Sequence, residues 1–145
     1  MPTSSKKAVL DTNILVYAMN STAPEHGASK ALRDKGVAGH IEAYVTPQIL
    51  FEYFAVVTNA RFVTTPISGE EALADVESMA AAFNVLTPPA DLTNKVVALT
   101  RQLGFKGRHI FDVQIAATML SAGITDIYTY DDRFEKIPGL VVHRP

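Results

Sequence analysis

The stretch Val9-Leu10-Asp11-Thr12-Asn13 decides how the rest of the chain is interpreted. Val9 and Leu10 are typical of the end of a buried strand, and Asn13 with the apolar residues after it is typical of a helix entry. In an open parallel sheet, ligands bind in the crevice beyond the carboxyl ends of the strands. We therefore expect the carboxylate of Asp11 to face such a crevice.

Length and composition indicate one globular domain. The chain has 145 residues, of which 48% are hydrophobic and 19% charged, so we expect a single domain over 1–145 with a flexible terminus at 1–6. The net charge of −2 excludes a strongly basic nucleic-acid clamp, and the absence of cysteine excludes disulfides, thiolate metal sites and cysteine nucleophiles. We see no signal peptide and no membrane segment, which predicts a soluble, cytoplasmic protein.

Short apolar runs alternate with segments of helical spacing along the chain. The runs predict strands at 7–10, 43–45, 84–86, 127–129 and 140–142, and the spacing predicts helices at 13–19, from 24 or 25 to 36, and at 48–60, 68–82, 90–103 and 109–122. Thr46 is expected to cap the helix that Pro47 begins, and Ser68 with Glu71 forms a capping box. This alternation predicts an α/β fold, with a mainly parallel central sheet of about five short strands flanked by helices.

Two acids lie in helices whose other residues are mostly apolar. Glu52 and Asp112 are each surrounded in sequence by residues typical of a core. Burying a lone carboxylate costs several kcal/mol, so each is expected to be paired, protonated or bound to a metal ion. A structural ion pair with Arg61, Arg108 or Arg133, or an exposed stripe on the helix, is an equally good explanation of either acid alone.

A fourth acid, Asp131, follows the predicted strand at 127–129, as Asp11 follows the strand at 7–10. Turn residues are often aspartates, so Asp131 alone indicates little. Two acids at strand ends and two in apolar helices are harder to explain separately, because carboxylates gathered in one crevice repel one another and need cations. Oxygen ligands without cysteine or clustered histidine favour Mg²⁺ or Mn²⁺ over zinc.

Four short motifs contain these acids. They are Leu10-Asp11-Thr12-Asn13, Thr46-Pro47-Gln48-Ile49-Leu50-Phe51-Glu52, Phe111-Asp112-Val113-Gln114-Ile115-Ala116-Ala117 and Thr129-Tyr130-Asp131-Asp132-Arg133-Phe134. In their order and spacing they resemble the motifs of the PIN-domain ribonucleases, and most closely those of the VapC-type toxins of toxin–antitoxin pairs. The resemblance covers nearly the whole chain and implies a single PIN-like domain.

The resemblance also implies an activity and a site. The activity would be that of a Mg²⁺- or Mn²⁺-dependent endoribonuclease, the toxin of a type II toxin–antitoxin system. The metal-binding and catalytic acids would be Asp11, Glu52, Asp112 and Asp131; Thr12 and Thr129 would orient carboxylates, and Asn13 would help to fix the strand-to-helix turn. The spacing to Thr129 and Phe134 favours Asp131 over Asp132 as the fourth acid, and leaves both open.

The implied chemistry is hydrolysis of an RNA phosphodiester by a water that the metal ion activates, leaving a 5′-phosphate and a 3′-hydroxyl. Arg108 and His109 precede Asp112 and are candidates for substrate binding at the mouth of the crevice, and Arg133 could bind an RNA phosphate. The family resemblance further implies a cognate antitoxin and a homodimer as partners. The RNA target cannot be deduced from the sequence.

Three alternatives remain. A Mg²⁺-dependent phosphatase could use Asp11 as its nucleophile, although such enzymes generally have a second aspartate where this chain has Asn13. A response-regulator receiver expects an early acidic pair and a phosphoacceptor in mid-chain, which we cannot place. A catalytically silent PIN scaffold would bind RNA or protein and cleave nothing.

Overall fold

A parallel five-stranded sheet forms the centre of the protein. The computed structural model describes residues 6–145, and the strand order is β3-β2-β1-β4-β5. The strands are β1 (Lys7–Leu10), β2 (Glu42–Val45), β3 (Asn84–Val85), β4 (Asp126–Tyr128) and β5 (Val141–His143). The predicted α/β class and parallel sheet are confirmed. Of the predicted flexible terminus, residues 1–5 lie outside the described residues, and the carbonyl of Lys6 accepts a hydrogen bond of 2.8 Å from the backbone of Glu42.

Helices connect the strands. They are α1 (Thr12–Met19), α2 (His26–Val37), α3 (Pro47–Val57), α4 (Gly69–Ala82), α5 (Leu92–Leu103), α6 (His109–Ser121) and the 3-10 helix η1 (Asp132–Lys136). The predicted end of α3 at residue 60 was wrong, because the helix ends at Val57 with Thr58 as its C-cap. The helix η1 was not predicted. Within residues 6–145, none of the helices has the length and apolar character needed to cross a membrane.

Two of the helix starts follow from the predicted caps. The side chain of Thr46 accepts a hydrogen bond of 3.2 Å from the backbone N–H of Ile49, and Pro47 occupies the first turn of α3. Ser68 accepts a bond of 3.1 Å from the N–H of Glu71 at the start of α4. Each cap satisfies a donor that the helix itself leaves free, which defines where α3 and α4 begin.

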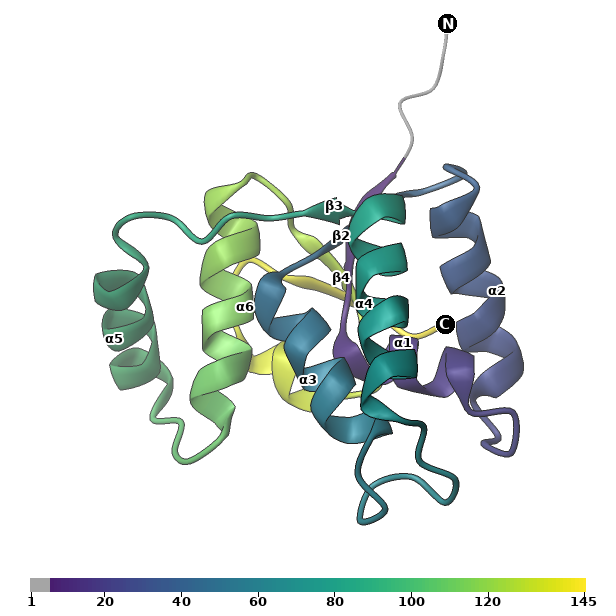
Figure 1. Cartoon of the computed structure of the whole chain (residues 1–145). Helices are drawn as coiled ribbons and strands as arrows, with labels where there is room; N and C mark the ends of the chain where they lie inside the picture. The colour runs from purple at the N-terminus through teal and green to yellow at the C-terminus, as the bar shows by residue number, and fades with distance from the viewer. Residues whose placement is uncertain (1–5) are drawn as a thin grey trace, which may run out of the picture.

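The path of the chain reverses direction in the sheet beside β1. From β1 the chain passes through α1 and α2 to β2 and then through α3 and α4 to β3, and it returns through α5 and α6 to β4 on the other side of β1. In Figure 1, α5 and α6 lie to the left of the strands, and α4 and α2 lie to the right. A crevice is expected at such a reversal, beyond the carboxyl ends of β1 and β4.

The core forms where the helices pack against the sheet, and one glycine permits the closest approach. Val9, Leu10 and Ile127 in the middle strands are fully buried. Gly36 on α2 faces β2 so closely that an added Cβ atom would lie 2.9 Å from Cβ of Ala43 and 3.2 Å from the ring of Phe83. Side chains larger than hydrogen therefore have no space at this position.

We expect Gly36→Ala to destabilise the protein by about 1–3 kcal/mol, because the added methyl group overpacks the contact between α2 and β2. Gly27→Ala is the matched control on the same helix. Nothing lies within 4 Å of an added Cβ there, so the higher helix propensity of alanine should leave stability unchanged or raise it by up to about 1 kcal/mol. Urea denaturation of both variants measures the difference, and equal stabilities would contradict the close packing of α2.

Candidate active site

Asp11 lies at the carboxyl end of β1, next to the end of β4. The register pairs Leu10 with Tyr128, so that the following residues, Asp11 and Thr129, become neighbours. The hydroxyl of Thr129 donates a hydrogen bond of 2.7 Å to Oδ2 of Asp11, and the backbone N–H of Thr12 donates one of 2.8 Å to Oδ1. Only 6% of Asp11 is exposed. Its carboxylate is therefore held in one orientation at the predicted crevice.

Asn13 connects the same two strand ends. Its amide nitrogen donates to the hydroxyl of Thr129 over 3.2 Å and to Oδ2 of Asp11 over 3.4 Å. Its amide oxygen accepts a bond of 3.3 Å from the backbone N–H of Tyr130. The resemblance implied a role for Asn13 in the strand-to-helix turn. Its contacts extend further and tie the start of α1 to the segment after β4.

Glu52 on α3 is oriented by two donors. The hydroxyl of Thr12 donates a hydrogen bond of 3.1 Å to Oε2 of Glu52, and the amide of Gln48 donates one of 2.8 Å to Oε1. The same amide also donates to the backbone carbonyl of Phe111 on α6 over 3.3 Å. Gln48 was not among the predicted site residues, although a residue four positions before Glu52 on one helix is expected to share its face.

The four predicted acids line one cleft. Asp112 lies in the first turn of α6, and Asp131 directly precedes η1, whose Phe134 is fully buried and anchors the segment. The cleft has a volume of about 340 Å³, and its wall includes Asp11, Thr12, Asn13, Glu52, Asp112 and Asp131. Glu52 and Asp112 are half-buried rather than core residues, because both face this cleft. The structure therefore brings together acids from four separate parts of the sequence.

The carboxylates raise one another's affinity for protons. Burial raises the pKa of Asp11 to about 6, against the opposing hydrogen bonds from Thr129 and Thr12, and the charges of Glu52 and Asp131 raise it further. Burial also raises the pKa of Asp112 to about 7, together with the charges of Asp131 and Asp11. The cleft thus holds more negative charge than its surroundings balance.

The structure distinguishes Asp131 from Asp132. The side chain of Asp131 is 20% exposed and lies in the wall of the cleft. The side chain of Asp132 is 73% exposed and pairs with Arg144 near the carboxyl terminus. Asp131 is therefore the acid that lies with Asp11, Glu52 and Asp112, in agreement with the motif spacing.

A structural ion pair, the alternative explanation of the acids, is found on the side of the cleft with Asp112 and Asp131. Nε of Arg133 lies 4.0 Å from Oδ2 of Asp112, and Arg133 binds Asp131 directly over 2.7 Å. Burial raises the pKa of Asp131, but the hydrogen bonds and charge of Arg133 outweigh it and lower this pKa overall. Within residues 6–145, neither Glu52 nor Asp11 has an ion pair. Arg61 and Arg108 pair with none of the four acids.

The donor chemistry of the cleft fits a hard divalent cation. The donors are carboxylate oxygens, as Mg²⁺ and Mn²⁺ prefer, and Asp11 is a buried carboxylate without a positive partner among the described residues. In residues 6–145 no three acids or histidines already converge as a finished metal cage. Asp11, Glu52 and Asp112 are the acids that would hold an ion, since all three line the same cleft.

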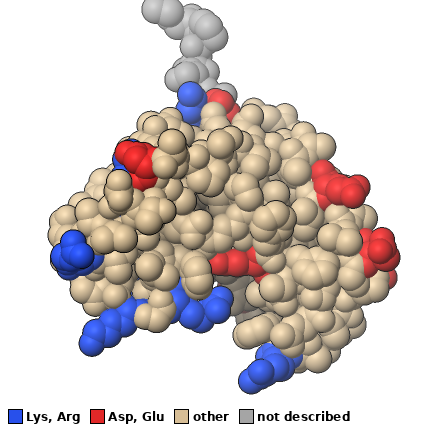
Figure 2. Space-filling view, turned by 60° about the vertical axis from the view of Figure 1, so that its left-hand side comes forward, with Lys and Arg blue, Asp and Glu red and all other residues tan. Residues whose placement is uncertain are grey.

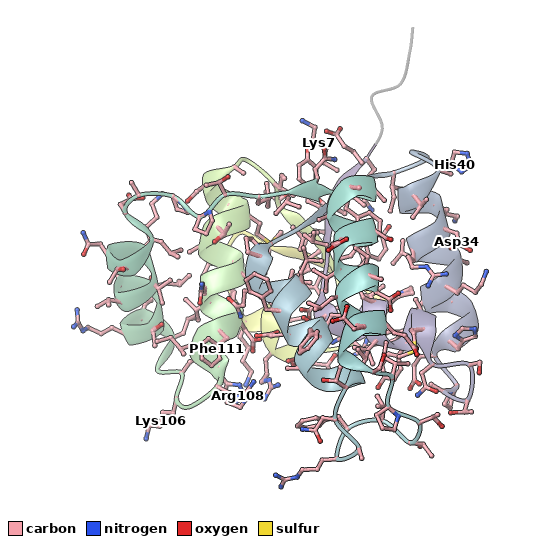
Figure 3. All side chains as sticks on the ribbon, viewed as in Figure 1. Lys7, Asp34, His40, Lys106, Arg108 and Phe111 are labelled. Carbon is pink, nitrogen blue, oxygen red and sulfur yellow. The ribbon has the colours of Figure 1, made fainter. Side chains whose placement is uncertain are left out.

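A second hollow adjoins the acids and has basic side chains in its wall. It has a volume of about 290 Å³ and is lined by Glu52, Arg108, His109, Phe111, Asp112 and Arg133. The guanidinium of Arg108 lies 5.6 Å from the ring centre of Phe111, which is 40% exposed, and Figure 3 shows both side chains at the same end of α6. In Figure 2, basic side chains gather beside a hollow in which acidic side chains are visible. The two residues predicted to bind substrate, Arg108 and His109, thus lie beside the acidic cleft.

Comparison with known proteins gives one family. A family model described as PIN domain matches residues 8–140. Ribonuclease VapC24 of Mycobacterium tuberculosis is 31% identical over 121 residues, which cover 83% of each protein.

Solved structures share the fold. The crystal structure of Mycobacterium tuberculosis VapC20, described as a sarcin-ricin loop cleaving toxin, has a TM-score of 0.72 and 21% identity. The superposition covers 95% of this chain and 99% of the VapC20 chain. A toxin-antitoxin complex from Klebsiella pneumoniae has a TM-score of 0.63 and 21% identity, covering 95% of this chain and 99% of that chain.

The raised pKa of Asp112 predicts how stability changes with pH. Because its pKa in the folded protein, about 7, is above the ordinary 3.8, the folded protein keeps a proton that the unfolded chain has lost between these values. The contribution of Asp112 to the stability of the metal-free wild type therefore becomes less favourable as the pH rises through this range. Asp112→Asn removes the charge, so its stability relative to the wild type should be higher by about 1–3 kcal/mol near pH 8 than near pH 5.

Urea denaturation in EDTA at about pH 5 and about pH 8 measures this difference. Asp132→Asn is the control, since Asp132 is exposed and lies outside the wall of the cleft. A stability difference for Asp112→Asn that stays the same at both pH values would show that Asp112 has no unusual pKa.

Proposed function

The chain belongs to the PIN domain family, among the VapC ribonucleases, and we propose that it is a Mg²⁺- or Mn²⁺-dependent endoribonuclease that acts as the toxin of a toxin–antitoxin pair. The observation that carries the proposal is the gathering of Asp11, Glu52 and Asp112 in one cleft with too little positive charge to balance them. A scaffold that only bound RNA or protein would have no use for these costly acids.

The residues around the cleft perform two tasks in this proposal. Thr129 and Thr12 hold Asp11 and Glu52 so that their oxygens face the cleft. Asp11, Glu52 and Asp112 hold the cation. When bound, Mg²⁺ or Mn²⁺ supplies the positive charge that lets an anionic phosphodiester enter, and activates water as the nucleophile. The acids only hold the cation in this proposal. Because the cation activates the water, no histidine or lysine is required as a general base.

The second hollow is the proposed entrance for RNA. Arg108 and His109 can bind phosphate oxygens there, and the exposed ring of Phe111 offers a surface on which a base can stack. Contacts of this kind bind RNA without reading its sequence, so they are compatible with several RNA targets.

A cognate antitoxin is the proposed protein partner. The Klebsiella pneumoniae neighbour, which shares the fold, was solved as a toxin-antitoxin complex. An antitoxin that places a basic side chain in the acidic cleft would neutralise the carboxylates and exclude the cation.

A homodimer is also proposed, by analogy with the family. Exposed apolar side chains are available for it: Phe51 is 66% exposed on α3, beside a mostly apolar hollow of about 440 Å³ that Pro47, Ala55 and Pro88 help to line. Light scattering of the purified protein measures the mass in solution, and a monomer at all concentrations would contradict the proposal.

The test of the proposed activity is cleavage of a mixed RNA pool. We expect cleavage with Mg²⁺ or Mn²⁺, none with EDTA, and fragments with a 5′-phosphate and a 3′-hydroxyl. Removing a residue that merely supports a metal ligand costs 10- to 100-fold, so Asp11→Asn should reduce the rate by at least about a hundredfold. Asp132→Asn should cleave at the wild-type rate, because Asp132 lies outside the cleft.

Three other outcomes would contradict the proposal. EDTA-insensitive cleavage that leaves a 2′,3′-cyclic phosphate would exclude this mechanism. Intact RNA under every condition, with the antitoxin verifiably absent, would favour a silent scaffold, and hydrolysis of small phosphomonoesters in place of RNA would favour the phosphatase alternative.

The proposed RNA entrance has a separate test. The double variant Arg108→Ala/His109→Ala should bind RNA more weakly in EDTA, where no cleavage occurs. The slope of log affinity against log salt should fall by about one for each RNA phosphate that the variant no longer binds. Lys30→Ala is the control, because Lys30 pairs with Asp34 on α2, far along the chain from the hollow. Unchanged affinity and cleavage in the double variant would exclude Arg108 and His109 from substrate binding.

A further inference from the structure

Arg133 makes hydrogen bonds to both carboxylate oxygens of Asp131, one of the four acids of the cleft. Its Nη2 lies 2.7 Å from Oδ2 of Asp131, and its Nε lies 3.0 Å from Oδ1 and 3.2 Å from Oδ2. Its backbone N–H also donates to Oδ1 over 3.0 Å. A fork of this kind matches both oxygens of a carboxylate, which makes it one of the stronger ion pairs in proteins. Asp131 therefore has few free lone pairs for another cation.

The same guanidinium extends toward a second acid. Its Nε lies 4.0 Å from Oδ2 of Asp112, and its Nη1 lies 3.1 Å from Nε2 of His109. Nδ1 of His109 is in turn 3.8 Å from the same oxygen of Asp112. Among residues 6–145, Arg133 is the only lysine or arginine that pairs with any of the four cleft acids. Arg133 thus lies between Asp131 and Asp112, where it supplies part of the charge that a metal ion would supply.

The surface position of Arg133 allows its guanidinium to move away from Asp131 and Asp112. Its side chain is 48% exposed, and it extends from the short helix η1 at the surface. That helix does not depend on Arg133 for its place, since Phe134 is fully buried and Asp131 accepts the backbone N–H at the helix start. The guanidinium can therefore turn away from the acids without unfolding the segment. Arg133 already lines the second hollow together with Arg108 and His109, so on leaving the acids its guanidinium would stay beside these two basic side chains.

We propose that Arg133 is a built-in counter-ion of the cleft, which a divalent cation displaces when it binds and which is then free to hold an RNA phosphate. The inference rests on the proposed metal-dependent function and adds its regulation. In the metal-free protein Arg133 reduces the repulsion between Asp131 and Asp112. Arg133 competes with the ion at Asp112, whose Oδ2 lies 4.0 Å from its Nε, so the apparent dissociation constant rises as the fraction of molecules in which Arg133 has left becomes smaller.

A structural ion pair is the competing explanation, and metal affinity separates the two. If Arg133 only stabilises η1, removing it lowers stability and leaves the affinity for a cation unchanged or weaker. If Arg133 competes with the cation, removing it strengthens cation binding. The matched control is Arg144, which pairs with Asp132, the residue next to Asp131 that lies outside the wall of the cleft.

The experiment measures Mn²⁺ binding to the full chain without RNA, by the loss of the paramagnetic resonance signal of free Mn²⁺. We expect Arg133→Gln to bind Mn²⁺ about five- to tenfold more tightly than the wild type, because a forked ion pair no longer competes with the ion. Arg133→Lys should lie between the two, because lysine keeps the charge and lacks the fork. Arg144→Gln should bind as the wild type does.

A second measurement covers stability. Without Mn²⁺, Arg133→Gln should melt at a lower temperature than the wild type, and at saturating Mn²⁺ the difference should disappear. A loss of the same size with and without Mn²⁺, or an affinity of Arg133→Gln equal to or below that of the wild type, would overturn the inference. Should Arg133→Gln fail to fold, unchanged Mn²⁺ affinity in Arg133→Lys would overturn it in the same way.

The outcomes also separate this inference from the proposed function. If the wild type binds Mn²⁺ and the Arg133 variants bind it with the same affinity, the inference about Arg133 is overturned and the proposed metal-dependent nuclease is unaffected. If neither the wild type nor the variants bind Mn²⁺, both the proposed metal-dependent function and the inference about Arg133 are overturned. Binding that appears only after Arg133 is replaced would be the strongest support for displacement.

Discussion

The hydrogen bond from Thr129 to the buried carboxylate of Asp11 is the interaction on which the rest of the site depends. It joins the ends of β1 and β4, the two strands between which the chain reverses direction in the sheet. Asn13 bonds to both of these side chains, and Thr12 continues the network from the same turn to Glu52 on α3. One buried contact therefore sets the geometry for two of the acids. Without the parallel pairing of β1 and β4, none of these side chains would be neighbours.

Electrostatic repulsion is the main cost of this arrangement. The pKa of Asp11 and that of Asp112 are raised, and a raised carboxylate pKa means that the folded state holds the charged form poorly. The protein offsets the repulsion on one side only, where Arg133 binds Asp131. The side with Asp11 and Glu52 has hydrogen-bond donors and no ion pair among the described residues. Such asymmetry is typical of a site whose remaining positive charge comes from a ligand. In the proposed arrangement, Arg133 competes with that ligand for the acids.

The local features were predictable because they depend on residues that are close in sequence. Thr46 and Pro47 define the start of α3 through one cap, and apolar spacing located the strands and helices to within a few residues. The helix η1 was missed because its residues are mostly charged and only Phe134 is buried. The end of α3 was placed too late because Ala60 follows Val57 at helical spacing, whereas Thr58 already ends the helix and donates its hydroxyl to the carbonyl of Phe54. Glu52 and Asp112 interrupt apolar helices, which made them candidates for one crevice, and both line the cleft.

By itself, the sequence determined which elements form and which acids follow or interrupt them, because caps, turns and hydrophobic periods act over a few residues. The identity of the acidic set was also accessible, since a carboxylate in an apolar segment is unusual wherever the segment folds. Only the tertiary structure decided that these acids meet, that Asp131 and not Asp132 joins them, and that Arg133 turns toward the cleft. The bond between Thr129 and Asp11 spans 118 positions, and that between Thr12 and Glu52 spans 40. Contacts over such separations exist only once the parallel strands have paired in one register, which no local pattern encodes.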